Sequence, residues 1–183
     1  MGEHEVAAVF LDRDGVINRA IVRDGRPHSP ATLDEFQIVD DAGEACRQLK
    51  AAGFLLVIAT NQPDVGRGRQ LREIVEQMHA QILERLPIDR IEVCYDAGDT
   101  PSEFRKPAPG MLLRVAREMG VSLKRSFMVG DRWRDIDCGH AAGCTTILID
   151  YGYREALRQP PDYRVKNLRE ATDTVLATTR RMG

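Results

Sequence analysis

The sequence has few aromatic residues, no excess of charge of either sign and no long apolar run. Aromatic residues make up 5% of its 183 residues, which argues against a surface that stacks nucleic-acid bases. The formal net charge is −2, so bulk electrostatics gives no reason to expect a nucleic-acid or membrane partner. No apolar run approaches the roughly 18 residues of a membrane span, and the N-terminal residues do not resemble a signal peptide.

The cysteines do not have the spacing of a disulfide framework or a metal site. Cys46, Cys94, Cys138 and Cys144 include no Cys-x-x-Cys pair, so we expect reduced thiols in a cytoplasmic protein. Hydrophobic residues make up 43% and charged residues 30%, which is ordinary for a globular protein.

Short apolar runs alternate with amphipathic segments along most of the chain. Apolar runs without polar alternation are typical of strands covered on both faces of a parallel sheet. We expect strands at 6–11, 54–59, 91–95, 126–130 and 145–150, and helices at 40–53, 70–86, 109–120, 136–143 and 167–182. The alternation predicts an α/β fold with a doubly wound, mainly parallel sheet in three α/β/α layers.

The chain length favours one domain over residues 1–183, since domains of this size are common. Within it, the motifs described below lie in a core at about 6–151. We expect the remaining segment, about 152–183, to be a helical tail that packs on the sheet.

The first expected strand runs into two carboxylates, in the stretch "VFLDRDGVIN". Alternate residues of an extended chain point the same way, so Asp12 and Asp14 are expected to face one ligand while Arg13 points elsewhere. Gly15 permits a sharp turn directly after them. Because ligands of doubly wound sheets bind beyond the carboxyl ends of the strands, the two aspartates are expected at the ligand-binding edge.

Polar residues at the ends of other strands are expected at the same edge. Thr60 and Asn61 offer a hydroxyl and an amide, which are suited to phosphate oxygens. Asp131 follows a later strand. Together with Asp12 and Asp14 it makes a set of hard oxygen ligands suited to Mg²⁺, which takes one or two carboxylates together with substrate phosphate oxygens.

Lys106 precedes an expected helix in the stretch "FRKPAPGM". A cation there opposes the helix dipole, and a bound anion would remove that conflict. Asp135, four residues after Asp131, is suited to pair with the Lys106 ammonium. Each feature alone also has an ordinary structural explanation, such as a solvated turn or an acidic helix start. The order and placement of all of them together are more specific for a phosphate-binding site than any one feature alone.

These motifs, "DRDG", Thr60, Lys106 and "GDRWRD", resemble those of the haloacid dehalogenase-like (HAD) phosphatase superfamily in the same chain order. The resemblance implies that Asp12 is the nucleophile and that Asp14 is the general acid and then the base. It implies that Thr60 and Lys106 hold the transferring phosphoryl group. Mg²⁺ would be bound by Asp12, the backbone carbonyl of Asp14 and Asp131.

The stretches "DRDGVIN", "TNQPDVGRG", "RKPAPGM" and "GDRWRDI" are similar to those of heptose-1,7-bisphosphate and histidinol-phosphate phosphatases. This similarity implies a Mg²⁺-dependent phosphomonoesterase that removes the 7-phosphate of D-glycero-D-manno-heptose 1,7-bisphosphate. Histidinol phosphate or another small phosphate ester is the alternative substrate. Asn61, Gln62, Arg105 and Arg132 would contact the substrate, and the stretch "RAIVRDGRPHSP" would face it. We expect a monomer or weak homo-oligomer.

Many members of this subgroup carry a structural zinc loop, with Cys-x-His followed by Cys-x-Cys just before the Arg-Lys pair. Here the first pair is Cys94 and Asp96, and the second is Ser102 and Phe104. One thiol and one carboxylate do not complete a tetrahedral zinc site. We therefore predict no structural zinc.

About 45 residues separate Asp14 from Thr60, and a similar number separate Thr60 from Lys106. A strand, a helix and short loops together need about as many residues as each of these segments has. We therefore expect no cap domain. Two other classes of protein fit the sequence less well. A signalling receiver domain would have adjacent acidic residues after its first strand, which this chain lacks. A non-catalytic phosphosugar-binding protein would not need both Asp12 and Asp14.

Overall fold

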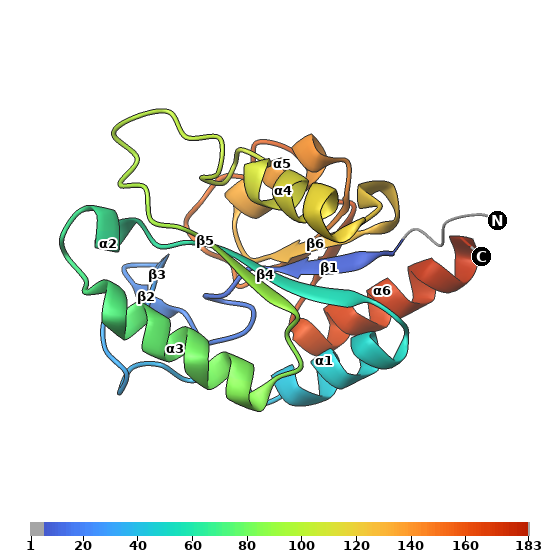
Figure 1. Ribbon diagram of the computed structural model, residues 1–183, viewed down its shortest axis with the longest axis horizontal. Coiled ribbons are helices and arrows are strands. Elements are labelled where there is room, and N and C mark those ends of the chain that lie inside the picture. Colours follow the sequence, from blue (N-terminus) through green and yellow to red (C-terminus); the bar gives the residue numbers. More distant parts are fainter. Residues whose placement is uncertain (1–5, 183) are drawn as a thin grey trace.

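The computed structural model describes residues 6–182. Its main sheet has six strands in the order β5-β4-β1-β6-β7-β8, and every neighbouring pair is parallel (Figure 1). The strands are β1 (Ala8–Leu11), β4 (Leu55–Asn61), β5 (Arg90–Cys94), β6 (Phe127–Gly130), β7 (Thr145–Ile149) and β8 (Tyr163–Val165). The predicted parallel α/β fold is confirmed.

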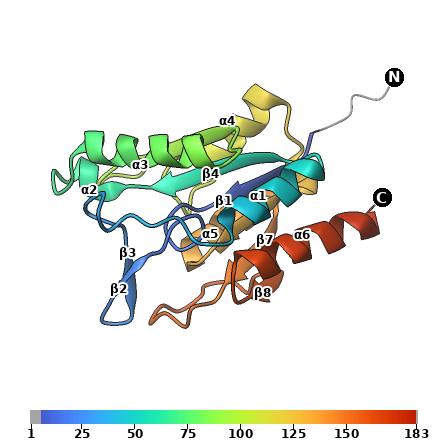
Figure 2. The same ribbon diagram turned by 90° about the horizontal axis from the view of Figure 1, so that it is seen from below.

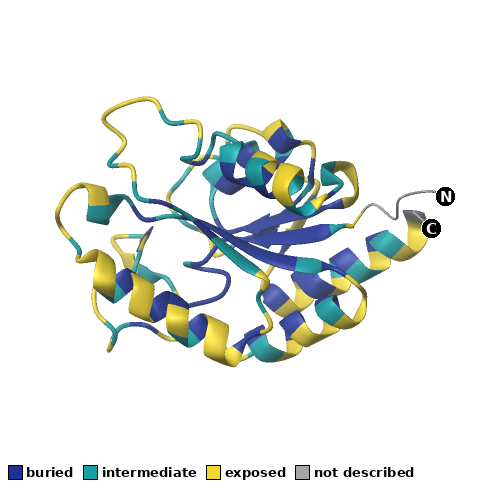
Figure 3. Cartoon of the chain, viewed as in Figure 1, coloured by how far each residue is buried: buried dark blue, intermediate teal, exposed yellow. Residues whose placement is uncertain are grey.

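Helices cover both faces of this sheet. One face carries α1 (Ala42–Ala51), α3 (Arg72–Arg85) and α6 (Leu168–Met182), and the other carries α4 (Gly110–Met119) and α5 (Trp133–Ala142) (Figure 2). Side chains of β1 alternate between the two cores: Val9 and Leu11 pack on the first side, Ala8 and Phe10 on the second. Burial on both faces explains why the strands are apolar along their whole length (Figure 3).

Several short elements were not predicted from the sequence. They are the hairpin β2 (Ile21–Arg23) and β3 (Arg26–His28), the strand β8, the one-turn helix α2 (Pro63–Gly66) and the 3₁₀ helix Leu123–Arg125. Three or four residues are too few to show a hydrophobic period. As a result, the expected helical tail is partly strand, since β8 joins the sheet before α6 begins.

The chain order of the strands places a topological switch point beside β1. The chain passes from β1 outwards to β4 and β5, then returns to β6 on the other side of β1. The Asp12 amide donates to the Val129 carbonyl at 2.9 Å, so the carboxyl ends of β1 and β6 are joined. Ligands of doubly wound sheets bind at such a point.

The described residues contain no separate cap domain: the hairpin β2–β3 and α1 fill the segment between β1 and β4. Within residues 6–182, no helix is long and apolar enough to cross a membrane.

Candidate active site

A cavity of about 290 Å³ opens at the carboxyl ends of β1, β4 and β6. Nine of the ten predicted site residues line it: Asp12, Asp14, Asn61, Gln62, Arg105, Lys106, Asp131, Arg132 and Asp135. The tenth, Thr60, is only 1% exposed, and its hydroxyl accepts a hydrogen bond from Gln62 Nε2 at 3.0 Å. The parallel topology thus gathers residues that lie more than 120 positions apart in the sequence.

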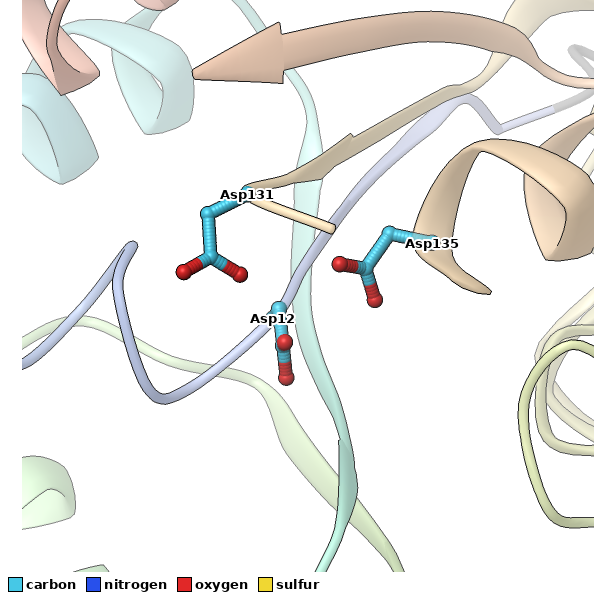
Figure 4. Close-up of side chains that lie close together, drawn as sticks. All are labelled: Asp12, Asp131 and Asp135. Atoms are coloured by element: carbon cyan, nitrogen blue, oxygen red, sulfur yellow. The ribbon is translucent and has the colours of Figure 1, made fainter. Parts of the chain in front are cut away.

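Three buried carboxylates converge in this cavity. Oxygens of Asp12, Asp131 and Asp135 lie within 4.8 Å of one another (Figure 4). The Lys106 ammonium lies between two of them, 2.9 Å from Asp12 Oδ1 and 2.6 Å from Asp135 Oδ1. Asp135 Oδ2 accepts from the Arg132 amide at 3.0 Å. Asp135 is therefore fully engaged in holding Lys106 and the start of α5, which leaves Asp12 and Asp131 to face a ligand.

Asp131 is an acceptor without a donor. Both of its carboxylate oxygens are buried and have no hydrogen-bond partner among the described residues. Burial, then the charges of Asp12 and Asp135, raise the pKa of Asp131 well above its ordinary value. The nearby Tyr153 hydroxyl lowers the pKa of Asp131, but by less than these causes raise it. Neither Asp131 oxygen has a hydrogen bond to this hydroxyl. A buried polar atom left unpaired is costly, so Asp131 fits a hard divalent cation.

Gly15 makes room for the Asp131 carboxylate. Its φ is +84°, and a Cβ atom there would lie 1.9 Å from Asp131 Oδ2. Only glycine satisfies both the backbone conformation and the close approach. Gly15 of the "DRDG" motif is therefore required for two reasons: it permits the turn, and it leaves room for the Asp131 carboxylate.

The pKa of Asp12 is also raised, to about 7. Burial is the largest cause, followed by the charge of Asp135, and Lys106 opposes them. Because the folded-state pKa lies above the ordinary value near 3.8, the folded protein binds this proton more tightly than the unfolded chain. The contribution of Asp12 to the free energy of unfolding is therefore most favourable below about pH 4 and decreases as the pH rises to about 7.

We expect Asp131→Asn to stabilise the protein when divalent cations are removed. The substitution removes one of three crowded negative charges, and the new amide can donate to a neighbouring carboxylate. A gain of roughly 1 kcal/mol would raise the melting temperature by about 2–4 °C. Melting curves in EDTA at pH 7.5 test this, with Mg²⁺ titrated in parallel. A variant less stable than the parent in EDTA, or one that Mg²⁺ stabilises as strongly as the parent, would contradict the expectation.

Arg13 does not line the cavity that Asp12 and Asp14 line, as expected, but it contacts Asp14 directly. Its side chain folds back onto Asp14, with Nη2 2.9 Å from Oδ1 and Nε 3.1 Å from the same oxygen. The guanidinium is completely buried, and a buried charge requires a partner. The neighbouring carboxylate supplies that partner, so Asp14 is held by its own sequence neighbour.

Asp14 accepts three further hydrogen bonds, from Asn18 Nδ2 at 2.9 Å, Ser29 Oγ at 2.7 Å and Gln62 Nε2 at 3.0 Å. Burial alone would raise the pKa of Asp14, but the Arg13 charge and these hydrogen bonds outweigh it and lower the pKa. Asp14 is therefore ionised at neutral pH in the substrate-free protein.

The two polar residues at the end of β4 have structural partners. Asn61 makes a reciprocal pair with the backbone of Lys106: its Nδ2 donates to the Lys106 carbonyl at 2.9 Å and its Oδ1 accepts from the Lys106 amide at 3.0 Å. Gln62 Nε2 donates a hydrogen bond to the Thr60 hydroxyl. The roles predicted for these side chains on substrate stay predictions, and the contacts show that Asn61 positions Lys106.

A rim of basic side chains lines the outer cavity. Besides Arg105 and Arg132 it contains Arg26, Arg67 and Arg134. Of these, only Arg105 and Arg132 are predicted from the sequence to contact the substrate. The Arg132 guanidinium pairs with Glu155 through Nε, at 3.0 Å from Oε2, and through Nη2. Arg26 belongs to the stretch that the resemblance placed facing the substrate, and Arg67 and Arg134 lie within the stretches "TNQPDVGRG" and "GDRWRDI", where they were given no role.

The loop after β5 is closed by hydrogen bonds between side chains. Ser102 Oγ donates to Asp96 Oδ2 and accepts from the amides of Phe104 and Arg105, each at 3.3 Å. Arg105 Nη1 donates to the Asp96 carbonyl at 3.4 Å. The loop that carries Arg105 to the cavity is thus held together by Asp96 and Ser102.

The absence of structural zinc stays a prediction. We expect the purified protein to contain far less than one zinc per chain, because the four positions of the zinc motif hold only one thiol, of Cys94, and one carboxylate, of Asp96. Elemental analysis of protein purified without chelators tests this. Stoichiometric zinc whose removal lowers the melting temperature would contradict it.

Known proteins with this fold and with similar sequences were compared with the chain. The family model described as HAD-hydrolase-like matches residues 103–171. D-glycero-beta-D-manno-heptose-1,7-bisphosphate 7-phosphatase of Pasteurella multocida is 37% identical, over 79% of this chain and 82% of that protein. The protein of the same name in Yersinia pestis is 38% identical, over 80% and 82%.

Among solved structures, D,D-heptose 1,7-bisphosphate phosphatase from B. bronchiseptica, complexed with magnesium and phosphate, superposes with a TM-score of 0.76. It is 26% identical, and the match covers 94% of this chain and 99% of that one. The fold is that of a HAD-like phosphatase. Within that class, the chain belongs to the family of D-glycero-D-manno-heptose-1,7-bisphosphate 7-phosphatases.

Proposed function

We propose that this chain is a Mg²⁺-dependent phosphomonoesterase that removes the 7-phosphate from D-glycero-D-manno-heptose 1,7-bisphosphate. It acts in the cytoplasm as a monomer or weak homo-oligomer. The observation that carries the proposal is the arrangement of three side chains. Lys106 Nζ lies 2.9 Å from Asp12, while Asp131, within 4.8 Å of Asp12, has both oxygens unpaired. This arrangement supports the roles of Asp12 as nucleophile, of Lys106 as the cation for phosphate and of Asp131 as a metal ligand.

Asp12 and Asp131 would hold Mg²⁺ together with the backbone carbonyl of Asp14, a donor set of hard oxygens. When bound, Mg²⁺ neutralises negative charge on the phosphoryl oxygens. Lys106 contributes a second positive charge next to Asp12. Asp135 holds the Lys106 ammonium in this position. Mg²⁺ and Lys106 together would offset the negative charges of the clustered carboxylates of Asp12, Asp131 and Asp135.

The reaction proceeds in two steps on the chain's own residues. In the first step an Asp12 oxygen attacks phosphorus, the bond from phosphorus to the sugar oxygen breaks, and Asp14 gives its proton to the leaving alkoxide. In the second step Asp14 takes a proton from water, which attacks the phosphorus of the phospho-aspartate and frees Asp12. Phosphate leaves and Asp14 carries a proton again.

The first step requires protonated Asp14, yet Asp14 is ionised in the substrate-free protein. A bound phosphate dianion would raise the pKa of Asp14, because a nearby like charge favours the neutral form of a carboxyl group. Asp14 would then take up a proton from solvent before the first step. The four donors around Asp14 then stabilise its ionised form after the proton has left. We infer that this environment favours Asp14 as the base of the second step.

The basic rim supports a substrate with more than one anionic group. The side chains of Arg26, Arg67 and Arg134 add positive charge to the cavity beyond Lys106, which favours a bisphosphate over a monophosphate such as histidinol phosphate. This observation agrees with the substrate named for the relatives.

Phosphate release across a panel of substrates tests the proposal. The panel contains heptose 1,7-bisphosphates, histidinol phosphate, hexose phosphates and phosphopeptides, each with Mg²⁺ and with EDTA. We expect a strong preference for a heptose 1,7-bisphosphate that EDTA abolishes. Equal turnover of all esters would contradict the substrate, and no release from any would favour a non-catalytic phosphosugar-binding protein.

A further inference from the structure

One buried histidine outside the cavity contacts the charged network of the site. His79 lies on α3, is 4% exposed, and places its Nε2 atom 3.3 Å from Arg13 Nη1. Arg13 uses its Nε and Nη2 atoms on Asp14. His79 therefore contacts the terminal nitrogen of Arg13 that is not bonded to Asp14.

The chemistry of the two groups determines the protonation of this histidine. A guanidinium has only hydrogen-bond donors, so Nε2 of His79 must carry a lone pair and its proton must be on Nδ1. Nδ1 lies 3.7 Å from Glu76 Oε2, the carboxylate that would favour a proton there. Burial and the Arg13 charge lower the pKa of His79 to about 4, which agrees with a neutral ring.

Glu76 is in turn fixed by two donors. Its Oε1 atom accepts from the Tyr95 hydroxyl at 2.5 Å and from Arg72 Nε at 3.3 Å. A continuous line of contacts therefore runs from Tyr95, just after β5, through Glu76 and His79 to Arg13. Its last member is Asp14.

We propose that His79 is a positioning residue for Asp14 and acts through Arg13. By accepting from Nη1, neutral His79 fixes the plane of the Arg13 guanidinium, whose other edge holds Asp14 towards the cavity. Without this acceptor the buried guanidinium would turn to find another, and the Asp14 carboxylate would turn with it. The proposal rests on the proposed function, in which Asp14 transfers the proton.

Two substitutions of His79 separate positioning from packing. His79→Leu keeps the bulk but removes the acceptor, whereas His79→Gln keeps an acceptor oxygen on a side chain of similar reach. We expect His79→Leu to lower kcat by about tenfold to a hundredfold, the size of effect that misplacing a catalytic group produces. Its KM and its half-saturating Mg²⁺ concentration should stay close to those of the parent, and His79→Gln should keep most of the parental kcat.

Met78→Ala is the matched control for packing. Met78 is the adjacent residue of α3, is completely buried, and packs in the apolar core instead of on Arg13. We expect it to lower the melting temperature at least as much as His79→Leu, with a nearly parental kcat at a temperature where it is folded. If Met78→Ala loses as much kcat as His79→Leu, or if His79→Gln loses as much as His79→Leu, the positioning role is wrong.

The tautomer of His79 is tested without any assay of activity. Long-range ¹H–¹⁵N spectra of the ring in the full-length protein should show protonated Nδ1 and unprotonated Nε2 at pH 7. A proton on Nε2 would overturn the proposal. Lack of turnover by the parent protein would refute the proposed function and leave the tautomer unaffected, whereas normal kcat in His79→Leu would refute the positioning role alone.

Discussion

Replacement of Asp12 by asparagine is expected to abolish phosphate release, by about 10⁴-fold or more, as loss of a nucleophile does in other enzymes. The amide has nearly the same size but cannot form the phospho-aspartate. The fold should persist, because Asp12 is buried beside two like charges and Lys106 keeps its bond to Asp135 at 2.6 Å. Phosphate release and the melting temperature, measured on the same preparation, check both parts.

Asp137→Asn is the control for this substitution. Asp137 lies on α5, does not line the cavity, and accepts from Gln159 Nε2 at 3.1 Å near the surface. It makes the same chemical change two residues after Asp135 and should leave kcat nearly unchanged. If Asp12→Asn kept more than about a tenth of the parental kcat, a loss far smaller than removal of a nucleophile causes, Asp12 would not be the nucleophile.

Asp14→Asn is expected to lower kcat by about 10²–10⁴-fold, the usual contribution of general acid–base catalysis. The second step should suffer more than the first, because the environment of Asp14 favours its ionised form and asparagine cannot take a proton from water. Phosphorylated protein should therefore accumulate. Acid quenching at intervals after mixing with substrate measures the amount bound per chain.

This variant should also be less stable than the parent. Arg13 would stay buried without its charged partner, and breaking a buried ion pair in this way costs about 3–5 kcal/mol. The assay is therefore run well below the melting temperature of the variant. Parental kcat in folded Asp14→Asn would contradict the acid–base role, and a low kcat without accumulation would show that the first step is limiting.

Much of the fold was accessible from the sequence because a single physical rule governs the strands. Strands covered on both faces must be apolar throughout, so β1, β4, β6 and β7 are visible as apolar runs. Given parallel strands, the residues at their carboxyl ends must meet. That rule alone brings Asp12, Asn61 and Asp131 to one cavity.

The remainder depends on contacts between segments that local patterns do not encode. The direction of Arg13 is decided by burial and by His79, which lies 66 residues further along the chain. Strand alternation predicted only that Arg13 points away from the ligand, and it gave no sign that the guanidinium binds Asp14 and His79. Arg67, just after α2, and Arg134, on α5, line the same cavity although they lie 67 residues apart in the sequence.

The start of one helix is set by a local capping contact that the apolar pattern does not show. Helix α5 begins at Trp133 instead of at residue 136, since the Asp135 carboxylate accepts from the Arg132 amide and starts the helix earlier. Asp131 is therefore outside the helix and does not share a helix face with Asp135, although the two lie four residues apart. They meet instead across the loop that follows β6.

The most direct test of the account is to locate the phosphoryl group during a single turnover. Heptose 1,7-bisphosphate labelled in its 7-phosphate is mixed with excess protein and Mg²⁺, quenched in acid within milliseconds, and the modified peptide is identified by mass spectrometry. The account predicts label on Asp12, which appears and decays as phosphate is released and is absent in Asp12→Asn. Release of phosphate with no labelled intermediate, or label on any other residue, would contradict it.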